Sequence, residues 1–219
     1  MSRRPLGCLL EIAETLILTV VIFLVIQTFV AQPYRVEQAS MQNTLQEGEY
    51  VLIDKLTPRF DDYSRGDIVV FRPQEGEGEN GDTPFIKRVI GVPGDTVEIH
   101  DGAVFVNGIE LDETAYTYEG EPTLPSGDLD RWEVAEGMLF VLGDHRNNST
   151  DSRSPTIGPI PVSSVIGRAW LRYWPITALG ILETPRYPDL ERASRDSSAP
   201  LERTPWTRTL AGPRVARAA

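Results

Sequence analysis

The 219-residue sequence predicts a mainly β protein, with an antiparallel β-sheet domain behind one N-terminal transmembrane helix. Two features of the sequence support this fold class. A run of about 20 mostly apolar residues near the N-terminus is long enough to cross a bilayer as a helix. Beyond it, short stretches rich in β-branched and aromatic residues alternate with turn-forming residues, and no segment keeps a long helical period.

The apolar run spans residues 12–31, which we interpret as a transmembrane anchor after a cytoplasmic N-terminus of residues 1–11. Arg3 and Arg4 precede the run, so the positive-inside rule places the bulk of the chain outside the cytoplasm. A cleaved signal peptide is the competing interpretation. We favour an uncleaved anchor, because the run is long for a signal peptide and Phe29 is bulky for a position just before a cleavage site.

Residues 32–182 form the predicted extracytoplasmic β-rich domain. Its strand-like stretches are separated by turn signals, of which Asp101-Gly102 and Asn107-Gly108 are typical of tight hairpins. The predicted strands are residues 50–56, 67–73, 84–92, 96–100, 103–108, 138–144 and 165–174.

Two stretches interrupt this pattern, and a third follows it. Residues 73–84 are Gly-rich and acidic, which predicts a solvated loop. Residues 112–136 form either a small subdomain or a long excursion from the sheet. Residues 183–219 are rich in Pro, Arg, Ser and Thr, so we expect a disordered C-terminal tail.

The composition excludes several classes of function. The chain has 32 acidic against 21 basic residues, and the excess lies in residues 32–182, with 25 acidic and 12 basic side chains. Because phosphate contacts need clustered Lys and Arg, we expect no nucleic-acid partner. One cysteine, Cys8, and two histidines, His100 and His145, offer no ligand set for a metal, so we expect neither a metal nor a cofactor. The chain also contains only two lysines, both in this domain.

Two clusters of polar residues stand out against the β background. Ser40 lies a few residues past the apolar run, although an isolated serine is usually a solvated hydroxyl or a turn residue. Lys87 lies inside an apolar strand, where alternation places it on the same face as Phe85 and Val89. Burial on that face lowers the pKa of a lysine and lets its neutral amine act as a base. The alternative is that Lys87 extends its amine to solvent.

A third cluster, residues 143–153, follows the predicted strand 138–144. Its short polar side chains are typical of a turn that satisfies its own backbone, or of an Asp151–Arg153 ion pair that presents Ser149 to a neighbour. His145 suggests a Ser/His/Asp triad. We rank that interpretation behind a lysine base, because His145 lies in a turn already rich in hydrogen-bond donors.

In order and behind one apolar segment, the three clusters resemble the type I signal peptidases of bacteria, membrane serine peptidases with a Ser/Lys dyad. The resemblance covers the apolar segment and nearly all of residues 10–175, and three motifs in order are far more specific than one. The motifs are Ser40-Met41-x-x-Thr44-Leu45, Lys87-Arg88-Val89-Ile90-Gly91-Val92-Pro93-Gly94-Asp95 and Gly143-Asp144-x-Arg146-x-x-Ser149-x-Asp151-Ser152-Arg153.

The resemblance implies a role for each matched residue. Ser40 would be the nucleophile and Lys87 the general base, and the backbone N–H of Ser40 would donate to the oxyanion. Ser149 would help to orient the lysine, with Asp151 and Arg153 as a supporting pair. Small pockets would select Ala-x-Ala ends by excluding bulk. The positions that match those pockets are Val36, Met41, Leu45, Phe85 and Ile86.

Three positions depart from the family pattern. Where the family often has Ser or Gly two residues before the nucleophile, this chain has Gln38, whose side-chain amide is a candidate second oxyanion donor. Where the family usually has Pro three residues after the nucleophile, Asn43 predicts a less rigid turn. His145 stands where many members have Asn, which we interpret as ordinary variation. Lys87 itself favours the prokaryotic branch, because the eukaryotic reticulum relatives use His there.

The resemblance therefore implies a membrane-bound serine endopeptidase, a hydrolase that removes N-terminal signal peptides from exported preproteins. It would be a single-pass protein of the cytoplasmic membrane, with its N-terminus inside and its catalytic domain on the outer face. The expected partners are signal peptides, the lipid bilayer and the secretion machinery. The alternative is a catalytically silent relative that binds exported chains, which Gln38 and Asn43 favour and the retained Ser40 and Lys87 oppose. A soluble self-cleaving repressor is disfavoured by the apolar segment.

Overall fold

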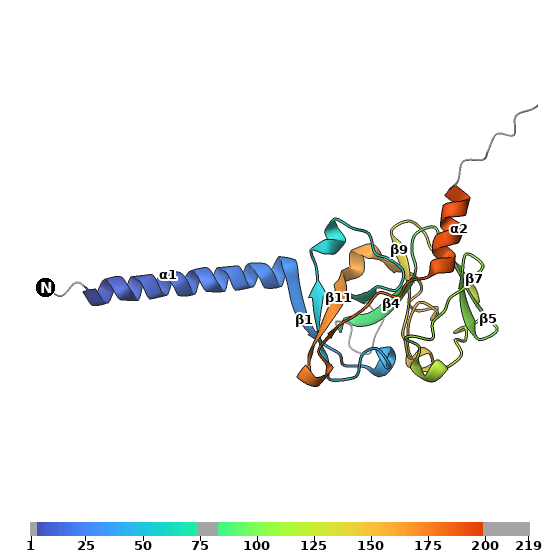
Figure 1. The fold of residues 1–219 in the computed structure, drawn as a ribbon, viewed down its shortest axis with the longest axis horizontal. Coiled ribbons are helices and arrows are strands. Elements are labelled where there is room, and N and C mark those ends of the chain that lie inside the picture. The colour runs from blue at the N-terminus through green and yellow to red at the C-terminus, as the bar shows by residue number, and fades with distance from the viewer. Residues whose placement is uncertain (1–3, 74–82, 199–219) are drawn as a thin grey trace, which may run out of the picture. The chain divides into compact units, whose positions relative to one another are not determined.

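The N-terminal segment is a long helix in the computed structural model, which describes residues 4–73 and 83–198 (Figure 1). Helix α1 (Arg4–Val25) continues into a π-helical turn (Ile26–Val30). The segment Leu9–Val30 is long and apolar enough to cross a membrane. The helix begins eight residues before the predicted start of the anchor, and it ends before Ala31, whose extended backbone already belongs to a strand.

Within the described residues, eight strands form one antiparallel sheet in the order β1-β2-β11-β3-β4-β9-β10, and β12 pairs with β11. All seven predicted strands are present, and those of the larger sheet bury apolar side chains. The strands of this sheet are β1 (Ala31–Arg35), β2 (Tyr50–Asp54), β3 (Ile68–Phe71), β4 (Phe85–Gly91), β9 (Met138–Leu142), β10 (Ile160–Pro161), β11 (Val165–Trp174) and β12 (Gly180–Ile181).

A second antiparallel sheet has the strand order β7-β6-β5-β8. Its strands are β5 (Thr96–His100), β6 (Ala103–Val106), β7 (Ile109–Glu110) and β8 (Arg131–Glu133). Both predicted hairpin turns are confirmed. Asp101 and Gly102 have φ values of 53° and 81°, and Asn107 and Gly108 have 54° and 77°, which is the left-handed conformation that a two-residue type I′ turn requires. The mainly β fold class is therefore confirmed.

The core lies on both faces of the larger sheet, because β3 contributes to two apolar clusters. Strand alternation sends Ile68 and Val70 into one cluster and Val69 and Phe71 into the other, so all four residues of β3 are buried. The first cluster contains Val36, Met41, Leu45, Val51, Ile53, Ile68, Val70 and Ala169. The second contains Val69, Phe71, Phe85, Val89, Leu139, Val141, Ile157 and Ile160.

The structure describes in full only one of the two segments that interrupt the predicted strands. Residues 112–130 run as an excursion with one 3-10 turn (Tyr118–Gly120), and the chain then joins the second sheet as β8. The predicted solvated loop at 73–84 lies mostly outside the described residues.

The structure differs from the prediction that the tail is disordered from residue 183 onward. Thr184 donates to the buried Asp67, and the buried Tyr187 hydroxyl lies 2.8 Å from that of Tyr116, so this stretch has defined partners. The chain then forms a separate unit, whose described part is helix α2 (Pro188–Ser198). A proline at its first position and acidic residues in its first turn favour helix initiation. The rest of the predicted tail, residues 199–219, lies outside the described residues.

Candidate active site

Ser40 lies in a tight turn that begins at Ala39, four residues after the end of β1. Residues 39–45, which we call the nucleophile loop, begin with a 3-10 turn (Ala39–Met41), and Leu45 N–H donates to Met41 O at 2.7 Å. The side chains of Met41 and Leu45 are fully buried in the first core cluster, which anchors the loop to the sheet. Ser40 itself is 4% exposed. Its backbone N–H lies in the first turn of the 3-10 segment, where N–H groups have no hydrogen-bond partner within the segment.

Lys87 lies in the middle of β4, opposite Val69 of β3. Its Nζ is 2.7 Å from Ser40 Oγ and donates to the carbonyl of Ile86 at 3.1 Å. The side chain is 1% exposed, so the alternative in which Lys87 extends to solvent does not hold. The Nζ also lies 5.3 Å from the ring centroid of Phe85, in agreement with the predicted alternation of β4. The two sequence-predicted catalytic residues thus lie in direct contact.

Burial lowers the pKa of Lys87 to about 8, because the charged ammonium loses its hydration. The negative charges of Asp151 and Asp144 oppose this effect, and the positive charge of Arg153 adds to it. Among the described residues Lys87 forms no ion pair. The amine therefore loses its proton much more readily than that of an ordinary lysine, and the neutral amine is the state that accepts a proton from a hydroxyl.

The third cluster packs against Ser40 through Gly143. A Cβ atom added at Gly143 would lie 2.3 Å from Ser149 Oγ and 2.6 Å from the carbonyl oxygen of Ser40, so glycine is required for this approach. Ser149 Oγ is buried and has no hydrogen-bond partner among the described residues. The structure therefore brings the Ser149 hydroxyl beside Ser40, but without the bond to Lys87 that its predicted orienting role needs.

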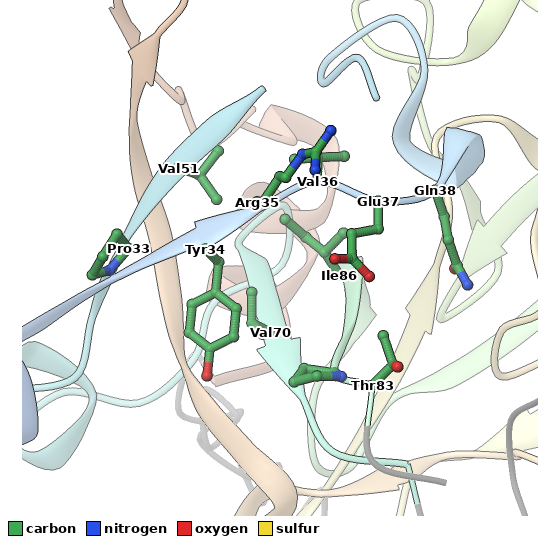
Figure 2. Close-up of a pocket in the computed structure, with 11 residues that line it drawn as sticks. Pro33, Tyr34, Arg35, Val36, Glu37, Gln38, Val51, Val70, Thr83 and Ile86 are labelled. Carbon is green, nitrogen blue, oxygen red and sulfur yellow. The ribbon is translucent and has the colours of Figure 1, made fainter. Parts of the chain in front are cut away.

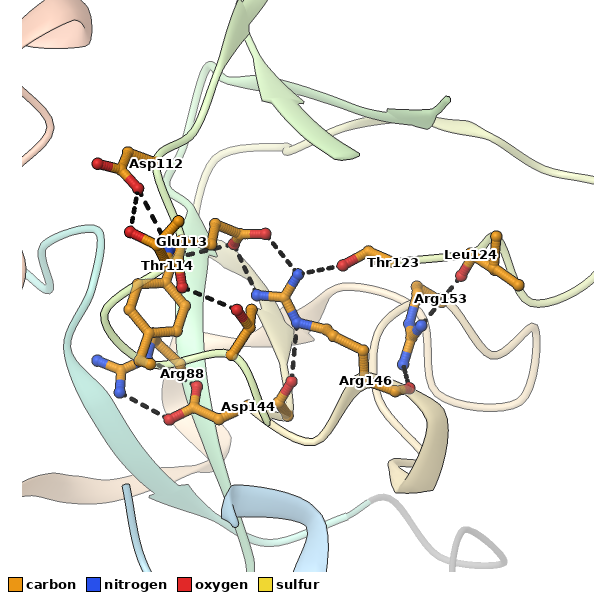
Figure 3. A network of polar contacts seen from close by, with 12 residues as sticks. Arg88, Asp112, Glu113, Thr114, Thr123, Leu124, Asp144, Arg146 and Arg153 are labelled. Atoms are coloured by element: carbon orange, nitrogen blue, oxygen red, sulfur yellow. Dashed lines mark hydrogen bonds and ion pairs between the residues drawn. The ribbon is translucent and has the colours of Figure 1, made fainter. Parts of the chain in front are cut away.

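Asp151 and Arg153 form a buried two-point ion pair, with Nε–Oδ1 and Nη2–Oδ2 distances of 2.8 and 2.9 Å. Asp151 also accepts from the backbone N–H of Gly143 at 3.1 Å. Arg153 donates to the carbonyls of Leu124 and Arg146 (Figure 3). The pair therefore joins the excursion to the turn that approaches Ser40.

Two further buried ion pairs surround the site, and sequence reasoning missed both. Arg88 binds Asp144 through Nε–Oδ1 and Nη2–Oδ2 contacts of 2.8 and 2.7 Å, with the two side chains 2% and 0% exposed. Arg146 binds Glu113 through two contacts of 2.6 Å (Figure 3). The available signal was the position of Arg88 and Asp144 in apolar strand-like runs, because a buried charge needs a partner.

A pocket of about 380 Å³ lies beside β1 and the start of β4 (Figure 2). Two of the predicted substrate-binding residues, Val36 and Ile86, line it, and Gln38 lies at its edge. The other three predicted residues do not line this pocket. Met41 and Leu45 are buried in the first core cluster, and Phe85 belongs to the second cluster. The full lining is Pro33, Tyr34, Arg35, Val36, Glu37, Gln38, Val51, Val70, Thr83, Pro84 and Ile86.

Comparison with known proteins shows the family of this chain. Residues 9–174 match the family described as "Signal peptidase, peptidase S26". The chain is 38% identical over 179 residues to "Probable signal peptidase I-2" of Synechocystis sp., covering 81% of this chain and 79% of that protein. It is 39% identical over 180 residues to "Signal peptidase I" of Leptolyngbya laminosa, with coverages of 81% and 85%. It is 34% identical over 183 residues to "Signal peptidase I" of Bacillus licheniformis, with coverages of 81% and 95%. The chain therefore belongs to the signal peptidase family, peptidase S26.

Proposed function

We propose that this protein is a membrane-bound Ser/Lys endopeptidase that cleaves N-terminal signal peptides from exported preproteins after small residues of the Ala-x-Ala type. Membership of a family of serine endopeptidases supports the reaction class. The observation that carries the residue assignment is the 2.7 Å contact between Ser40 Oγ and a buried Lys87 Nζ whose pKa is lowered to about 8.

The proposed reaction uses one proton carrier for both chemical steps. The neutral amine of Lys87 takes the Ser40 hydroxyl proton while Oγ attacks the scissile carbonyl carbon, and the resulting ammonium donates that proton to the leaving amine. A water molecule then gives a proton to the neutral Lys87 amine and attacks the ester carbon. The ammonium returns that proton to Ser40 Oγ as the ester bond breaks, which releases the signal peptide and regenerates the Ser40 hydroxyl. The carbonyl oxygen becomes negative twice, and the backbone N–H of Ser40 is its proposed donor.

We propose supporting roles for the residues that lie around Ser40. The Gln38 amide is the proposed second oxyanion donor, because Gln38 lines the pocket and lies two residues before Ser40 in the sequence. Asp151 and Arg153 are proposed to hold the turn at Gly143, against which Ser40 packs. We propose that the substrate side chains contact the walls around Val36 and Ile86, with Met41, Leu45 and Phe85 as the apolar surroundings.

The N-terminal helix supports a membrane location, because Leu9–Val30 has a mean hydropathy of 2.5 and is long enough for one crossing. We propose a single-pass orientation with Arg3 and Arg4 inside and the catalytic domain on the outer face of the cytoplasmic membrane. The lipid bilayer, signal peptides and the secretion machinery are then the partners. Added protease should digest residues 32–182 in spheroplasts but not in inside-out vesicles, and the reverse result would overturn the orientation.

The catalytic assignment is tested by cleavage of a purified preprotein with the full chain in detergent. Ser40→Ala and Lys87→Ala should each abolish cleavage. Lys55→Ala is the matched control, since Lys55 is the other of the two lysines and its amine donates to Gln32 Oε1 at 3.3 Å, away from Ser40. Full activity in either active-site variant would exclude the dyad, and preprotein binding without turnover by the unmodified chain would support the silent-relative alternative.

A further inference from the structure

We propose that residues 113–121 position the nucleophile loop through His145 and Asn43, so that Ser40 stays within reach of Lys87. This inference rests on the proposed function of Ser40 as nucleophile. It concerns two of the positions at which this chain departs from the family pattern. Both side chains link the nucleophile loop, directly or through a neighbour, to the excursion that connects β7 to β8.

The first link is Asn43. Its backbone φ is 87°, a left-handed conformation that proline, with φ fixed near −65°, cannot adopt. Its side-chain Nδ2 donates to the carbonyl of Thr117 at 3.1 Å. Thr117 is itself buried and donates to the carbonyl of Glu113 through both N–H and Oγ1, at 3.0 and 2.9 Å. The turn that we expected to be less rigid is therefore tied by a side chain to a firmly held segment.

The second link is His145, which contacts the nucleophile loop at two points. Its backbone N–H donates to the carbonyl of Ser40 at 3.0 Å. Its ring Nδ1 lies 2.9 Å from Oε1 of Gln42, two residues beyond Ser40. His145 thus contacts Ser40 through its backbone N–H, and its ring contacts the side chain of Gln42 in the same loop.

The excursion holds the other side of the His145 ring. The ring stacks on Tyr118 with centroids 4.3 Å apart and an interplanar angle of 28°. Its Nε2 lies 3.6 Å from Oε2 of Glu121, a buried oxygen with no hydrogen-bond partner among the described residues. Tyr118 N–H donates to the carbonyl of Asp144 at 3.0 Å, which fixes the stacking partner next to the histidine. The ring is thus enclosed by groups from residues 113–121 on one side and by the nucleophile loop on the other.

These contacts matter for catalysis because attack by a hydroxyl depends steeply on its position. A displacement of about 1 Å at a reacting group can lower the rate about 100-fold. The core fixes the loop at Met41 and Leu45, but Ser40, Gln42 and Asn43 are held by the polar contacts described above. His145 and Asn43 are therefore positioning residues, since they act through the loop and not on the substrate.

The test is a double-mutant cycle on His145 and Gln42, with kcat, KM and thermal unfolding measured on the full chain in detergent. His145→Ala and Gln42→Ala should each lower kcat by about 10- to 100-fold with little change in KM, and the double variant should be no worse than the poorer single variant. His145→Asn should recover only part of kcat, because its amide nitrogen can take the place of Nδ1 toward Gln42 but cannot stack on Tyr118.

The matched control is the second histidine. His100 also stacks on an aromatic ring, that of Phe105 at 4.1 Å, and its Nδ1 lies 3.1 Å from Asp101, but its strand belongs to the second sheet. His100→Ala should leave kcat unchanged. Wild-type kcat in His145→Ala, or an equal loss of kcat in His100→Ala, would overturn the inference.

The Asn43 link is tested separately by Asn43→Gly, which keeps the left-handed backbone and removes the bond to Thr117. It should lower kcat, whereas Asn107→Gly, at another left-handed asparagine with two side-chain bonds, should lower stability but not kcat. Ser40→Ala is measured in parallel. If Ser40→Ala stays active, the proposed function fails; if it is inactive while His145→Ala and Asn43→Gly keep wild-type kcat, only the positioning inference fails.

Discussion

Lys87 and Arg88 are neighbours in β4 and both are almost completely buried, yet of the two only Arg88 has a carboxylate partner among the described residues. Burial by itself lowers the pKa of Arg88, but the two-point bond to Asp144 outweighs it and raises that pKa. Lys87 lacks such a bond, and burial lowers its pKa to about 8. Because neighbouring strand residues point to opposite faces, Arg88 meets Asp144 and stays charged, whereas Lys87 faces Ser40 and can lose its proton.

The pH dependence of cleavage should follow the ionisation of Lys87. The neutral amine is the active form, so kcat/KM should rise about tenfold per pH unit below the pKa and level off above about 8. A rate measured from pH 5.5 to 9.5 with a fixed preprotein checks this. A profile that is flat or falls across that range would contradict Lys87 as the base.

Lys87→Met should stabilise the protein at neutral pH while abolishing cleavage. Below pH 8 Lys87 is protonated in both the folded and the unfolded state, so the folded state bears the full cost of burying the charge. As the pH rises from about 8 toward 10.5, the ordinary pKa of lysine, the folded state loses the proton first and this cost disappears. The shift corresponds to roughly 3 kcal/mol as an upper bound. Thermal unfolding at pH 7 and pH 10 should show a gain that shrinks with pH. Lys55→Met, at a partly exposed site, is the control and should show no such gain.

Asp144→Ala should destabilise the fold strongly, because it leaves the guanidinium of Arg88 buried without its partner. Loss of one member of a buried pair typically costs about 3–5 kcal/mol. The comparison is Glu98→Ala, which breaks the exposed Arg131–Glu98 pair and should cost less than about 1 kcal/mol. The free energy of unfolding in urea measures both. Equal losses would show that burial of Arg88 is not the decisive factor.

Two glycines flank β9, and their alanine variants should differ in effect. Gly143→Ala should lower cleavage, whereas Gly137→Ala should lower stability. The new Cβ at position 143 meets the carbonyl oxygen of Ser40 at 2.6 Å, so the nucleophile must shift and cleavage should fall by about 100-fold or more. Gly137 has φ 73° with open space around it, so its alanine should cost about 1–2 kcal/mol of stability and leave kcat unchanged. Equal activity of the two variants would contradict the close approach at Gly143.

Ser149→Ala should lower cleavage without lowering stability. Its hydroxyl has no hydrogen-bond partner among the described residues, so the fold loses no bond when it is removed. We propose that this hydroxyl turns to Lys87 during catalysis and orients its amine, and alanine cannot make that contact. Ser152→Ala is the matched control, because Ser152 Oγ accepts from the N–H of Val141 at 2.9 Å. Leaving that buried N–H unpaired should cost about 1–3 kcal/mol. Unchanged kcat in Ser149→Ala would remove Ser149 from the proposed machinery.

The features that the sequence determined by itself are those governed by neighbouring residues. The Asp101-Gly102 and Asn107-Gly108 turns follow from the low cost of left-handed backbone at those residue types, and the β4 strand follows from its run of β-branched residues. An amine in that apolar run was already the best candidate base, since burial acts on any lysine in such a strand.

The tertiary structure alone decided which distant groups meet. Ser40 reaches Lys87 across 47 residues and Arg88 reaches Asp144 across 56, and no local preference specifies either distance. The Asn43 turn was expected to be loose, but a bond to Thr117, 74 residues away, holds it. Such contacts depend on strand order and on core packing beneath the nucleophile loop, because the energy of a buried polar contact is realised only when the sheet has brought both partners together.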